Sequence, residues 1–304
     1  MNNELKGVIV PLITPLDIEG HVDENDLRGL VSHCINKGIN AIFINGSGGE
    51  STNLLPHDRI RTLNIANDEI GGRIPLLCGV LESSTAKVIE GVKTAQDSGA
   101  EYIVVTVPYY YGRLTDDEMY RHFYLIASNS TAKILLYDIP KYTNSTISVN
   151  LVEKLSAIPN IIGIKISNMD FSVIQNLLNI FDGSNFRIFQ GITAYAGISM
   201  LIGAHGYIPV MAPLMPELFC ALSDAAQSGH IKKTVRLQHL TNSLGKLQSV
   251  TNNQYACAKY AISLLNLTKE YITLPGNLLT EEQKSQVRQI YDKVLRDWDE
   301  YIGK

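Results

Sequence analysis

The sequence has little that would support a metal site or a disulfide framework. Its four cysteines, Cys34, Cys78, Cys220 and Cys257, lie far apart in apolar surroundings and form no C-x-x-C pair. We therefore expect reduced, buried thiols. The seven histidines show neither the H-x-x-x-H nor the H-E-x-x-H spacing, so we expect no metal and no other cofactor. His57 follows a proline at an expected helix start, where a solvated or capping role is favoured over catalysis.

The sequence also lacks the features of membrane and nucleic-acid-binding proteins. No apolar run reaches the ~18 residues of a membrane span. The net charge of −4 gives no basic excess of the kind that nucleic-acid binders carry. The N-terminal segment Met1–Lys6 has no apolar core like that of a signal peptide. We therefore expect a cytoplasmic protein with neither a membrane nor a nucleic acid as its partner.

Eight short runs rich in β-branched residues alternate with longer segments of helical periodicity. The runs are Gly7–Thr14, Ala41–Asn45, Ile74–Val80, Tyr102–Val107, Lys133–Tyr137, Ile161–Ile166, Phe186–Gln190 and Gly206–Val210. They are almost continuously apolar, which is typical of parallel strands that are covered on both faces.

The segments between these runs begin and end with helix-capping residues. Helix starts are indicated at Asp23–Asp26, Ser83–Thr85 and Thr115–Glu118, the last of which reads as a capping box. Gly38, Gly99 and Gly203 stand where helices should end. Eight such βα units predict an α/β protein with a (β/α)₈ TIM barrel. A doubly wound open sheet is the alternative, but no G-x-G-x-x-G follows the first strand.

The chain continues well beyond the eighth run. Further helices are expected over Leu214–Ser228, His230–Ser249, Tyr255–Leu265 and Glu281–Tyr301. A barrel needs one closing helix only. We therefore expect residues 1–228 to form the catalytic barrel and residues 229–304 to form a C-terminal helical extension packed on it.

Reactive groups of TIM barrels lie at the carboxyl ends of the strands, and Lys165 ends the sixth run. A lysine in an apolar strand either extends its amine to solvent or is a buried nucleophile. Burial lowers the pKa and raises the fraction of neutral amine, which can then condense with a ketone. The resulting iminium takes up the electrons released by C–C cleavage or proton removal without a metal.

Tyr137 ends the fifth run, beside Lys165 in the expected barrel. A strand tyrosine is most often a packing residue, but a phenol at this place could transfer protons to and from a substrate oxygen.

The loop after the second run contains Gly46, Ser47 and Gly48. Glycines let backbone amides approach an anion, and the Ser47 hydroxyl could bind a carboxylate. A phosphate would fit as well, although the loop has neither lysine nor arginine.

Three consecutive tyrosines, Tyr109–Tyr111, follow the fourth run. Core packing cannot use all three, so this loop predicts an active-site rim or a contact between subunits.

Together, these segments resemble the dihydrodipicolinate synthase / N-acetylneuraminate lyase family of class I aldolases over nearly the whole chain. The matching pieces are Pro11–Pro15, Gly46–Ser51, Pro108–Tyr110, Tyr137–Pro140, Gly163–Lys165 and Gly203–Gly206, in that order. The resemblance implies that Lys165 is the Schiff-base lysine and Tyr137 the proton-transfer tyrosine. It also implies that Ser47 and Tyr110 relay protons and that pyruvate is a substrate or product.

The resemblance has consequences for assembly and for the substrate site. In this family the tyrosine at the Tyr110 position is typically lent to a neighbouring subunit, which implies a homo-oligomer, either a dimer or a tetramer. Gly46, Gly48, Ser167, Ile208 and Tyr142 are expected to line the substrate site.

The identity of the aldehyde partner depends on where the chain departs from the family pattern. Dihydrodipicolinate synthases have an arginine for a second carboxylate where this chain has Tyr142, and Lys141 does not reproduce a guanidinium fork. The loop around Ser47 is similar to those of some 2-keto-3-deoxygluconate aldolases, and Ser167 matches a threonine position of sugar-acid lyases. The stretch Gly191–Ala194 lacks the Asp-Glu pair of sialic acid lyases. We therefore expect cleavage of a 2-keto-3-deoxy sugar acid, with dihydrodipicolinate synthase or N-acetylneuraminate lyase activity as alternatives.

Two alternatives lie outside this family. A phosphate-sugar isomerase on the same barrel would need a carboxylate or histidine at a strand end, and neither Glu50 nor Asp138 is expected to face the site. A catalytically inactive barrel used as a sensor would have lost Lys165 or Tyr137, and both are present.

Overall fold

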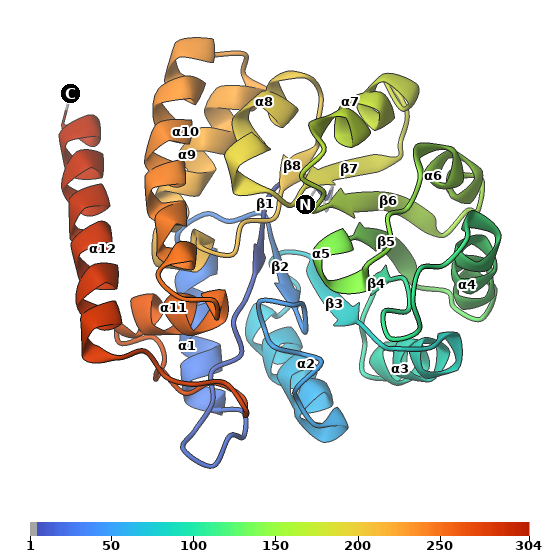
Figure 1. Cartoon of the computed structure of the whole chain (residues 1–304), viewed down its shortest axis with the longest axis horizontal. Helices are drawn as coiled ribbons and strands as arrows, with labels where there is room; N and C mark the ends of the chain where they lie inside the picture. The colour runs from blue at the N-terminus through green and yellow to red at the C-terminus, as the bar shows by residue number, and fades with distance from the viewer. Residues whose placement is uncertain (1–4, 304) are drawn as a thin grey trace.

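Eight parallel strands close into a barrel in the computed structural model, which describes residues 5–303 (Figure 1). The strands are β1 Gly7–Pro11, β2 Ala41–Ile44, β3 Leu76–Val80, β4 Tyr102–Thr106, β5 Lys133–Asp138, β6 Ile161–Ile166, β7 Arg187–Gln190 and β8 Gly206–Tyr207. Each strand pairs with its neighbours in sequence, and β8 closes on β1. The (β/α)₈ prediction is confirmed. Residues 1–4 of the segment considered for a signal peptide lie outside the described residues.

The strands are buried on both faces because alternate side chains point to opposite sides of the sheet. One set fills the barrel interior and includes Ile9, Phe43 and Phe189. The other set, which includes Val8 and Ile42, packs against the surrounding helices. This double burial explains why the strands read as continuous apolar runs.

The barrel helices alternate with the strands, and the three with starts named from the sequence begin at the predicted capping residues. The barrel helices are α1 Glu24–Asn36, α2 Pro56–Ile70, α3 Thr85–Asp97, α4 Asp116–Ser128, α5 Pro140–Thr143, α6 Val149–Ser156, α7 Phe171–Ile180, α8 Ala196–Leu201 and α9 Pro216–Gln227. Short 3₁₀ turns, η1 Thr193–Tyr195 and η2 Ala212–Leu214, precede α8 and α9. The capping box of Thr115 and Glu118 is present, and the Asp23 and Ser84 side chains cap α1 and α3.

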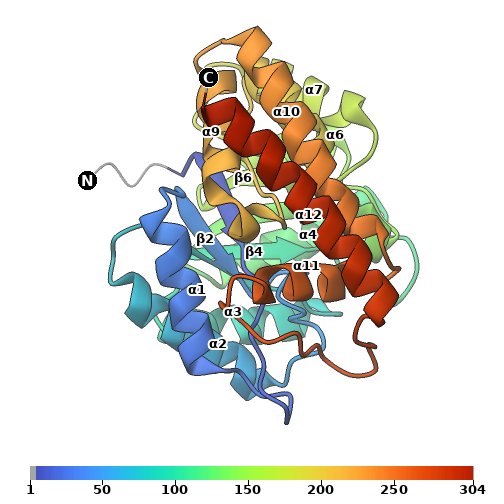
Figure 2. The same ribbon diagram turned by 90° about the vertical axis from the view of Figure 1, so that its left-hand side faces the viewer.

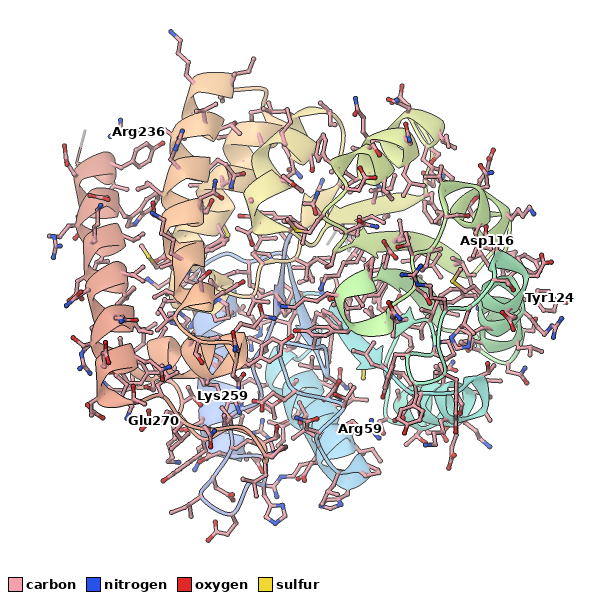
Figure 3. All side chains as sticks on the ribbon, in the orientation of Figure 1. Arg59, Asp116, Tyr124, Arg236, Lys259 and Glu270 are labelled. Atoms are coloured by element: carbon pink, nitrogen blue, oxygen red, sulfur yellow. The ribbon has the colours of Figure 1, made fainter. Side chains whose placement is uncertain are left out.

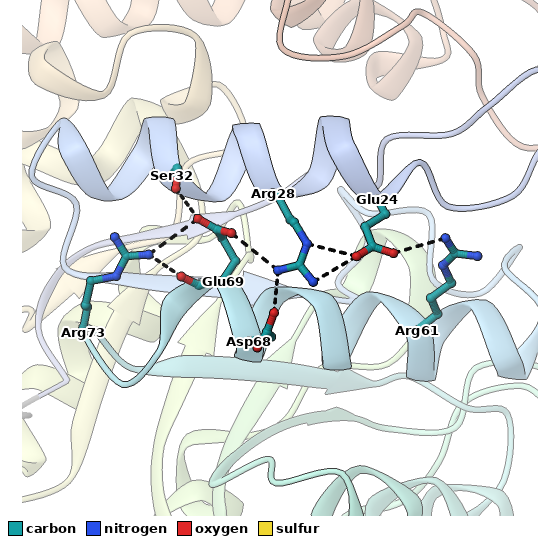
Figure 4. A network of polar contacts seen from close by, with 7 residues as sticks. All are labelled: Glu24, Arg28, Ser32, Arg61, Asp68, Glu69 and Arg73. Carbon is teal, nitrogen blue, oxygen red and sulfur yellow. Dashed lines mark hydrogen bonds and ion pairs between the residues drawn. The ribbon is translucent and has the colours of Figure 1, made fainter.

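A network of charged side chains joins the outer faces of α1 and α2 (Figure 4). Arg28 donates to Glu24 one turn earlier on α1 at 3.0 Å and to Asp68 on α2 at 2.6 Å. Arg61 extends the network to Glu24 at 3.5 Å. These groups are partly exposed to solvent, which screens the charges, so the pairs contribute little to stability.

The C-terminal helices form a layer beside the barrel. They are α10 Ile231–Gly245, the 3₁₀ turn η3 Lys246–Ser249, α11 Gln254–Ser263 and α12 Glu281–Ile302. Figure 2 shows α12 lying along α10, while α11 lies against the barrel. Among residues 5–303, no helix is both long and apolar enough to cross a membrane.

Several local predictions differ from the structure, and the first is the strand expected over 7–14, which ends at Pro11. The strand expected over 206–210 ends at Tyr207, because Pro209 has no N–H for the ladder and the chain turns there into η2. The long helix expected from His230 changes to 3₁₀ geometry after Gly245. All four cysteines are free thiols, but Cys220 is only half-buried rather than fully enclosed.

Candidate functional site

Lys165 lies on β6 inside the barrel and is 4% exposed. It stands beside Tyr137 in the β5–β6 register, and its Nζ lies 4.1 Å from the centre of the Tyr137 ring and 5.2 Å from that of Phe43. Burial lowers the pKa of Lys165 to about 7. The amine is therefore neutral in about half of the molecules at pH 7, as nucleophilic attack requires.

Tyr137 is buried next to this amine. Burial raises the pKa of its phenol to about 12, although hydrogen bonds with the side chains of Ser167 and Ser47 act in the opposite direction. The phenol is thus protonated at neutral pH and has hydroxyl neighbours through which a proton can move. The structure brings together Lys165, Tyr137, Ser47 and Ser167, four of the residues named from the sequence.

The loop that contains Ser47 is tightly folded. Gly49 N donates to Gly46 O at 3.1 Å, and a Cβ on Gly46 would come within 2.8 Å of the Phe43 ring. A Cβ on Gly48 would make only ordinary contacts, the nearest with Pro11 O at 3.6 Å. The helix that follows, α2, begins only at Pro56, several residues beyond this loop. Any anion would meet the amides of a turn rather than those of a helix N-terminus.

Glu50 ends this loop in a left-handed conformation, with φ +54°, and is buried. Its Oε1 lies 2.7 Å from Nζ of Lys259, which comes from α11 and is also buried (Figure 3). Glu50 Oε2 accepts from the backbone N and the hydroxyl of Thr273 at 2.9 and 2.6 Å. Lys259 Nζ also donates to Tyr271 O at 2.7 Å. The C-terminal extension therefore fixes one end of the Ser47 loop.

A cavity of about 320 Å³ opens beside Ser47. Its wall consists mainly of neutral side chains from the barrel loops and from the extension: Ser47, Glu50, Thr52, Asn53, Leu81, Thr106, Tyr109, Ile139, Tyr142, Thr143, Asn253, Tyr255, Thr273 and Gly276. Glu50 is the one charged residue among them, and it is paired with Lys259. The cavity thus offers hydroxyl and amide groups and no cation. A second cavity of about 330 Å³ lies between α2 and α3 and contains none of the predicted site residues.

The other predicted residues are distributed unevenly around this cavity. Tyr142 lies in its wall, where its hydroxyl is 2.8 Å from that of Tyr255 and accepts from Gln254 Nε2 at 2.9 Å. Ile208 is buried in the barrel interior and is not among the wall residues of the cavity, and neither are Lys165 and Tyr137. Tyr137 reaches the cavity wall through its hydrogen bond with Ser47. Tyr110 is 74% exposed and packs edge-on against Tyr111, so within one chain it is outside the site. Its role as a residue lent to another subunit stays a prediction.

Asp138 faces away from Tyr137, as strand alternation predicts. Its carboxylate accepts from Ile147 N at 3.0 Å and from Asn168 Nδ2 at 3.2 Å, outside the barrel interior. Burial raises the pKa of Asp138 to about 6. This carboxylate holds the segment after α5 and does not reach the cavity.

Sequence reasoning missed the contribution of α11 to the site. The sequence analysis did not identify Lys259, Tyr255 or Asn253 as site residues. Of the three, only Lys259 has a sequence context that could have indicated a role. It stands in the apolar stretch from Tyr255 to Ile262, just as Lys165 stands in an apolar strand. A lysine in such a stretch is either paired or functional.

Comparisons with known proteins agree with this architecture. The family model described as the dihydrodipicolinate synthetase family matches residues 4–294. The 4-hydroxy-tetrahydrodipicolinate synthase of Marinobacter nauticus is 32% identical over 284 residues, which cover 93% of this chain and 96% of that protein.

Two solved structures are also similar over most of their length. Dihydrodipicolinate synthase from Aquifex aeolicus superposes with a TM-score of 0.90 at 28% identity, with 95% of this chain and 98% of that chain covered. The second structure is YagE, a prophage protein of the dihydrodipicolinic acid synthase family from E. coli K12, which was solved in complex with pyruvate. It superposes with a TM-score of 0.90 at 25% identity, with 95% of this chain and 98% of that chain covered.

Proposed function

Because this chain belongs to the dihydrodipicolinate synthetase family of aldolase-type lyases, we propose that it cleaves a 2-keto-3-deoxy sugar acid to pyruvate and a hydroxyaldehyde. The observation that carries this choice of substrate is the neutral cavity beside Ser47. Its hydroxyl and amide groups suit a polyhydroxylated chain, whereas a second carboxylate would meet no cation there.

The chemistry that we propose starts at Lys165. Its neutral amine attacks the C2 carbonyl of the keto acid, and loss of water gives an iminium. During iminium formation the Tyr137 phenol gives its proton to the hydroxyl that leaves as water. The Tyr137 phenolate then accepts the proton of the C4 hydroxyl as the C3–C4 bond breaks, and the bonding electrons pass to the iminium to form an enamine. Protonation at C3 and hydrolysis then release pyruvate and regenerate the amine. The pKa of about 7 at Lys165 supports the first step.

Ser47 and the amides of Gly46 and Gly48 would bind the carboxylate of the keto acid in this proposal. Gly46 and Gly48 place no side chain over the turn, so an anion could approach its backbone N–H groups closely. Ser167 and Ser47 hydrogen-bond with Tyr137, so they would hold the phenol and return its proton. Pyruvate in the related YagE structure supports a keto-acid ligand of this size.

Dihydrodipicolinate synthase activity is the second candidate, because several relatives carry the name 4-hydroxy-tetrahydrodipicolinate synthase. That reaction joins pyruvate to aspartate semialdehyde, whose carboxylate needs a cationic partner. Tyr142 stands where an arginine would be expected, and the Lys141 ammonium lies 5.4 Å from the centre of the Tyr142 ring rather than in the cavity wall. Losing a bidentate arginine contact costs roughly 2–4 kcal/mol, or about 30- to 1,000-fold in kcat/KM.

The test is a side-by-side measurement of kcat/KM for cleavage of 2-keto-3-deoxy sugar acids and for condensation of pyruvate with aspartate semialdehyde. We expect the cleavage reaction to be faster, and Tyr142→Arg to raise the condensation rate selectively. Tyr142→Phe is the matched control, since it removes the hydroxyl without adding charge. A tenfold preference of the unmodified enzyme for aspartate semialdehyde would overturn the substrate assignment and leave the Schiff-base chemistry standing.

The expected homo-oligomer and cytoplasmic location stay predictions, as do the limits of the barrel at 1–228 and of the extension at 229–304. The exposed Tyr110 and Tyr111 rings support the oligomer, because neighbouring exposed aromatics favour a subunit contact.

A further inference from the structure

Two histidines and a buried aspartate come together on the outside of the barrel, away from Lys165. His21 lies in the β1–α1 loop, where its backbone N donates to Asp17 Oδ1 at 2.9 Å and its carbonyl accepts from Asp17 N at 2.8 Å. His57 and Asp58 lie in the first turn of α2. The loop backbone and the helix therefore hold the three side chains from two separate elements.

The ligand-type atoms of this group have the spacing of a metal site. His21 Nδ1 and His57 Nε2 each lie 3.6 Å from the same oxygen, Oδ2 of Asp58. One ligand atom from each of the three residues lies within 4.8 Å of the others. Ligands at ~2.0–2.1 Å from a tetrahedral zinc ion are roughly 3.3–3.4 Å apart. The two histidine–aspartate pairs at 3.6 Å therefore need a small contraction, and the two exposed imidazoles, within 4.8 Å of each other, need to approach by at most about 1.5 Å.

The burial pattern of the group points to a ligand as well. The Asp58 side chain is 4% exposed, and carboxylates are rarely buried without a partner. Both imidazole nitrogens are too far from it for good hydrogen bonds, which need about 2.7–3.2 Å. The two imidazoles are 53% and 67% exposed, so solvent has access to a fourth position. Among residues 5–303, this is the only such group of three His, Cys, Asp or Glu side chains.

We propose that His21, His57 and Asp58 bind a divalent transition metal of the zinc class. Two imidazoles and one carboxylate suit Zn²⁺, Co²⁺ or Ni²⁺, with water in the remaining position. The ion would clamp the β1–α1 loop to the first turn of α2. The two histidines are 36 positions apart in the chain, so no short spacing in the sequence could indicate this site.

The experiment uses the full chain without an affinity tag and titrates it with ZnCl₂ by isothermal titration calorimetry. We expect one site per chain, and a rise in Tm of roughly 4–6 °C when zinc exceeds Kd a hundredfold. Removing a residue that only hydrogen-bonds to a metal ligand typically weakens metal binding about 10–100-fold. Removing a ligand itself should therefore weaken zinc binding by at least about tenfold. His21→Gln and His57→Gln should each do so, whereas the exposed His239→Gln is the matched control and should not.

Cobalt provides a second readout in the same variants. Co²⁺ bound here should show visible d–d absorption without a thiolate charge-transfer band, because no cysteine belongs to the group. Asp58→Asn tests the buried ligand. If that variant does not fold, the variants of the two exposed histidines still test the proposal. Absence of zinc binding at micromolar protein, equal affinity in both histidine variants and the unmodified chain, or a thiolate band would overturn the proposal.

Discussion

The buried ion pair between Glu50 and Lys259 allows a quantitative prediction about the C-terminal extension. Lys259 is fully buried on α11, and its ammonium is held by the Glu50 carboxylate and by the carbonyl of Tyr271, each at 2.7 Å. Lys259→Met keeps the unbranched apolar part of the side chain, one atom shorter, and removes both contacts. It also leaves the Glu50 carboxylate buried without its cation, although the two hydrogen bonds from Thr273 remain.

The expected cost follows from this geometry. Removing one partner of a buried ion pair destabilises a protein by about 3–5 kcal/mol, because the other charge is left uncompensated. We therefore expect Lys259→Met to lower the free energy of unfolding by that amount in urea titrations. Adding Glu50→Gln should recover about 0.5–3 kcal/mol of this loss, since the remaining charge is removed. Lys133→Met is the control: Lys133 pairs with Glu101 at the surface and should cost at most about 1 kcal/mol.

The same substitution should affect catalysis through the Ser47 loop. Glu50 ends that loop, so its release should raise the KM for the keto acid more than it lowers kcat, at a temperature where the variant is folded. A free energy of unfolding within about 1 kcal/mol of the unmodified protein would refute the buried-pair reasoning. A normal KM in a destabilised variant would limit the pair to a structural role.

Four further predictions concern the proposed chemistry and assembly. Pyruvate with borohydride should add a lactyl-type mass to the peptide that holds Lys165, and Lys165→Ala should fold normally but lack turnover; labelling elsewhere would exclude this lysine. The trapping rate should rise with pH and level off above about 7, because burial lowers the pKa of Lys165 to about 7; a rise that continues to ~10 would indicate an ordinary amine. Tyr137→Phe should lower kcat by about 10²–10⁴-fold, and an unchanged kcat would assign the ring to packing. Sedimentation should show at least a dimer at micromolar concentration; fully active monomers of 33.6 kDa would contradict a role for Tyr110 in a neighbouring site.

The barrel could be predicted from the sequence because its signals are local. Each strand is buried on both faces and therefore reads as one apolar run, and capping residues such as Thr115 are effective within a few positions. The strand after Gly203 was predicted too long because Pro209 ends the ladder through a missing donor, which hydrophobicity does not reveal.

Only those residues of the candidate site that lie at the ends of strands could be predicted from the sequence. Lys165, Tyr137 and the Ser47 loop follow from the rule that parallel strands present their carboxyl ends on one face of a barrel. The wall that α11 supplies, with Tyr255 among its residues, depends on how the extension folds back over the barrel. Lys259 is more than 200 positions from Glu50, and no periodicity relates the two.

The two buried lysines show why the same sequence signal leads to different chemistry. Lys165 and Lys259 both interrupt apolar segments, and burial lowers the pKa of both. At Lys259 the carboxylate of Glu50 opposes that shift, and the ammonium is engaged by two oxygen acceptors. At Lys165 burial acts alone, because the neighbouring aromatic rings carry no carboxylate that would oppose the shift. We therefore expect the difference in reactivity between the two lysines to follow from the absence of a compensating carboxylate at Lys165 rather than from burial itself. Borohydride trapping should accordingly label Lys165 and leave Lys259 unmodified in the same sample, and Glu50→Gln should not redirect the label, because the Lys259 amine stays fully buried and still donates to Tyr271 O.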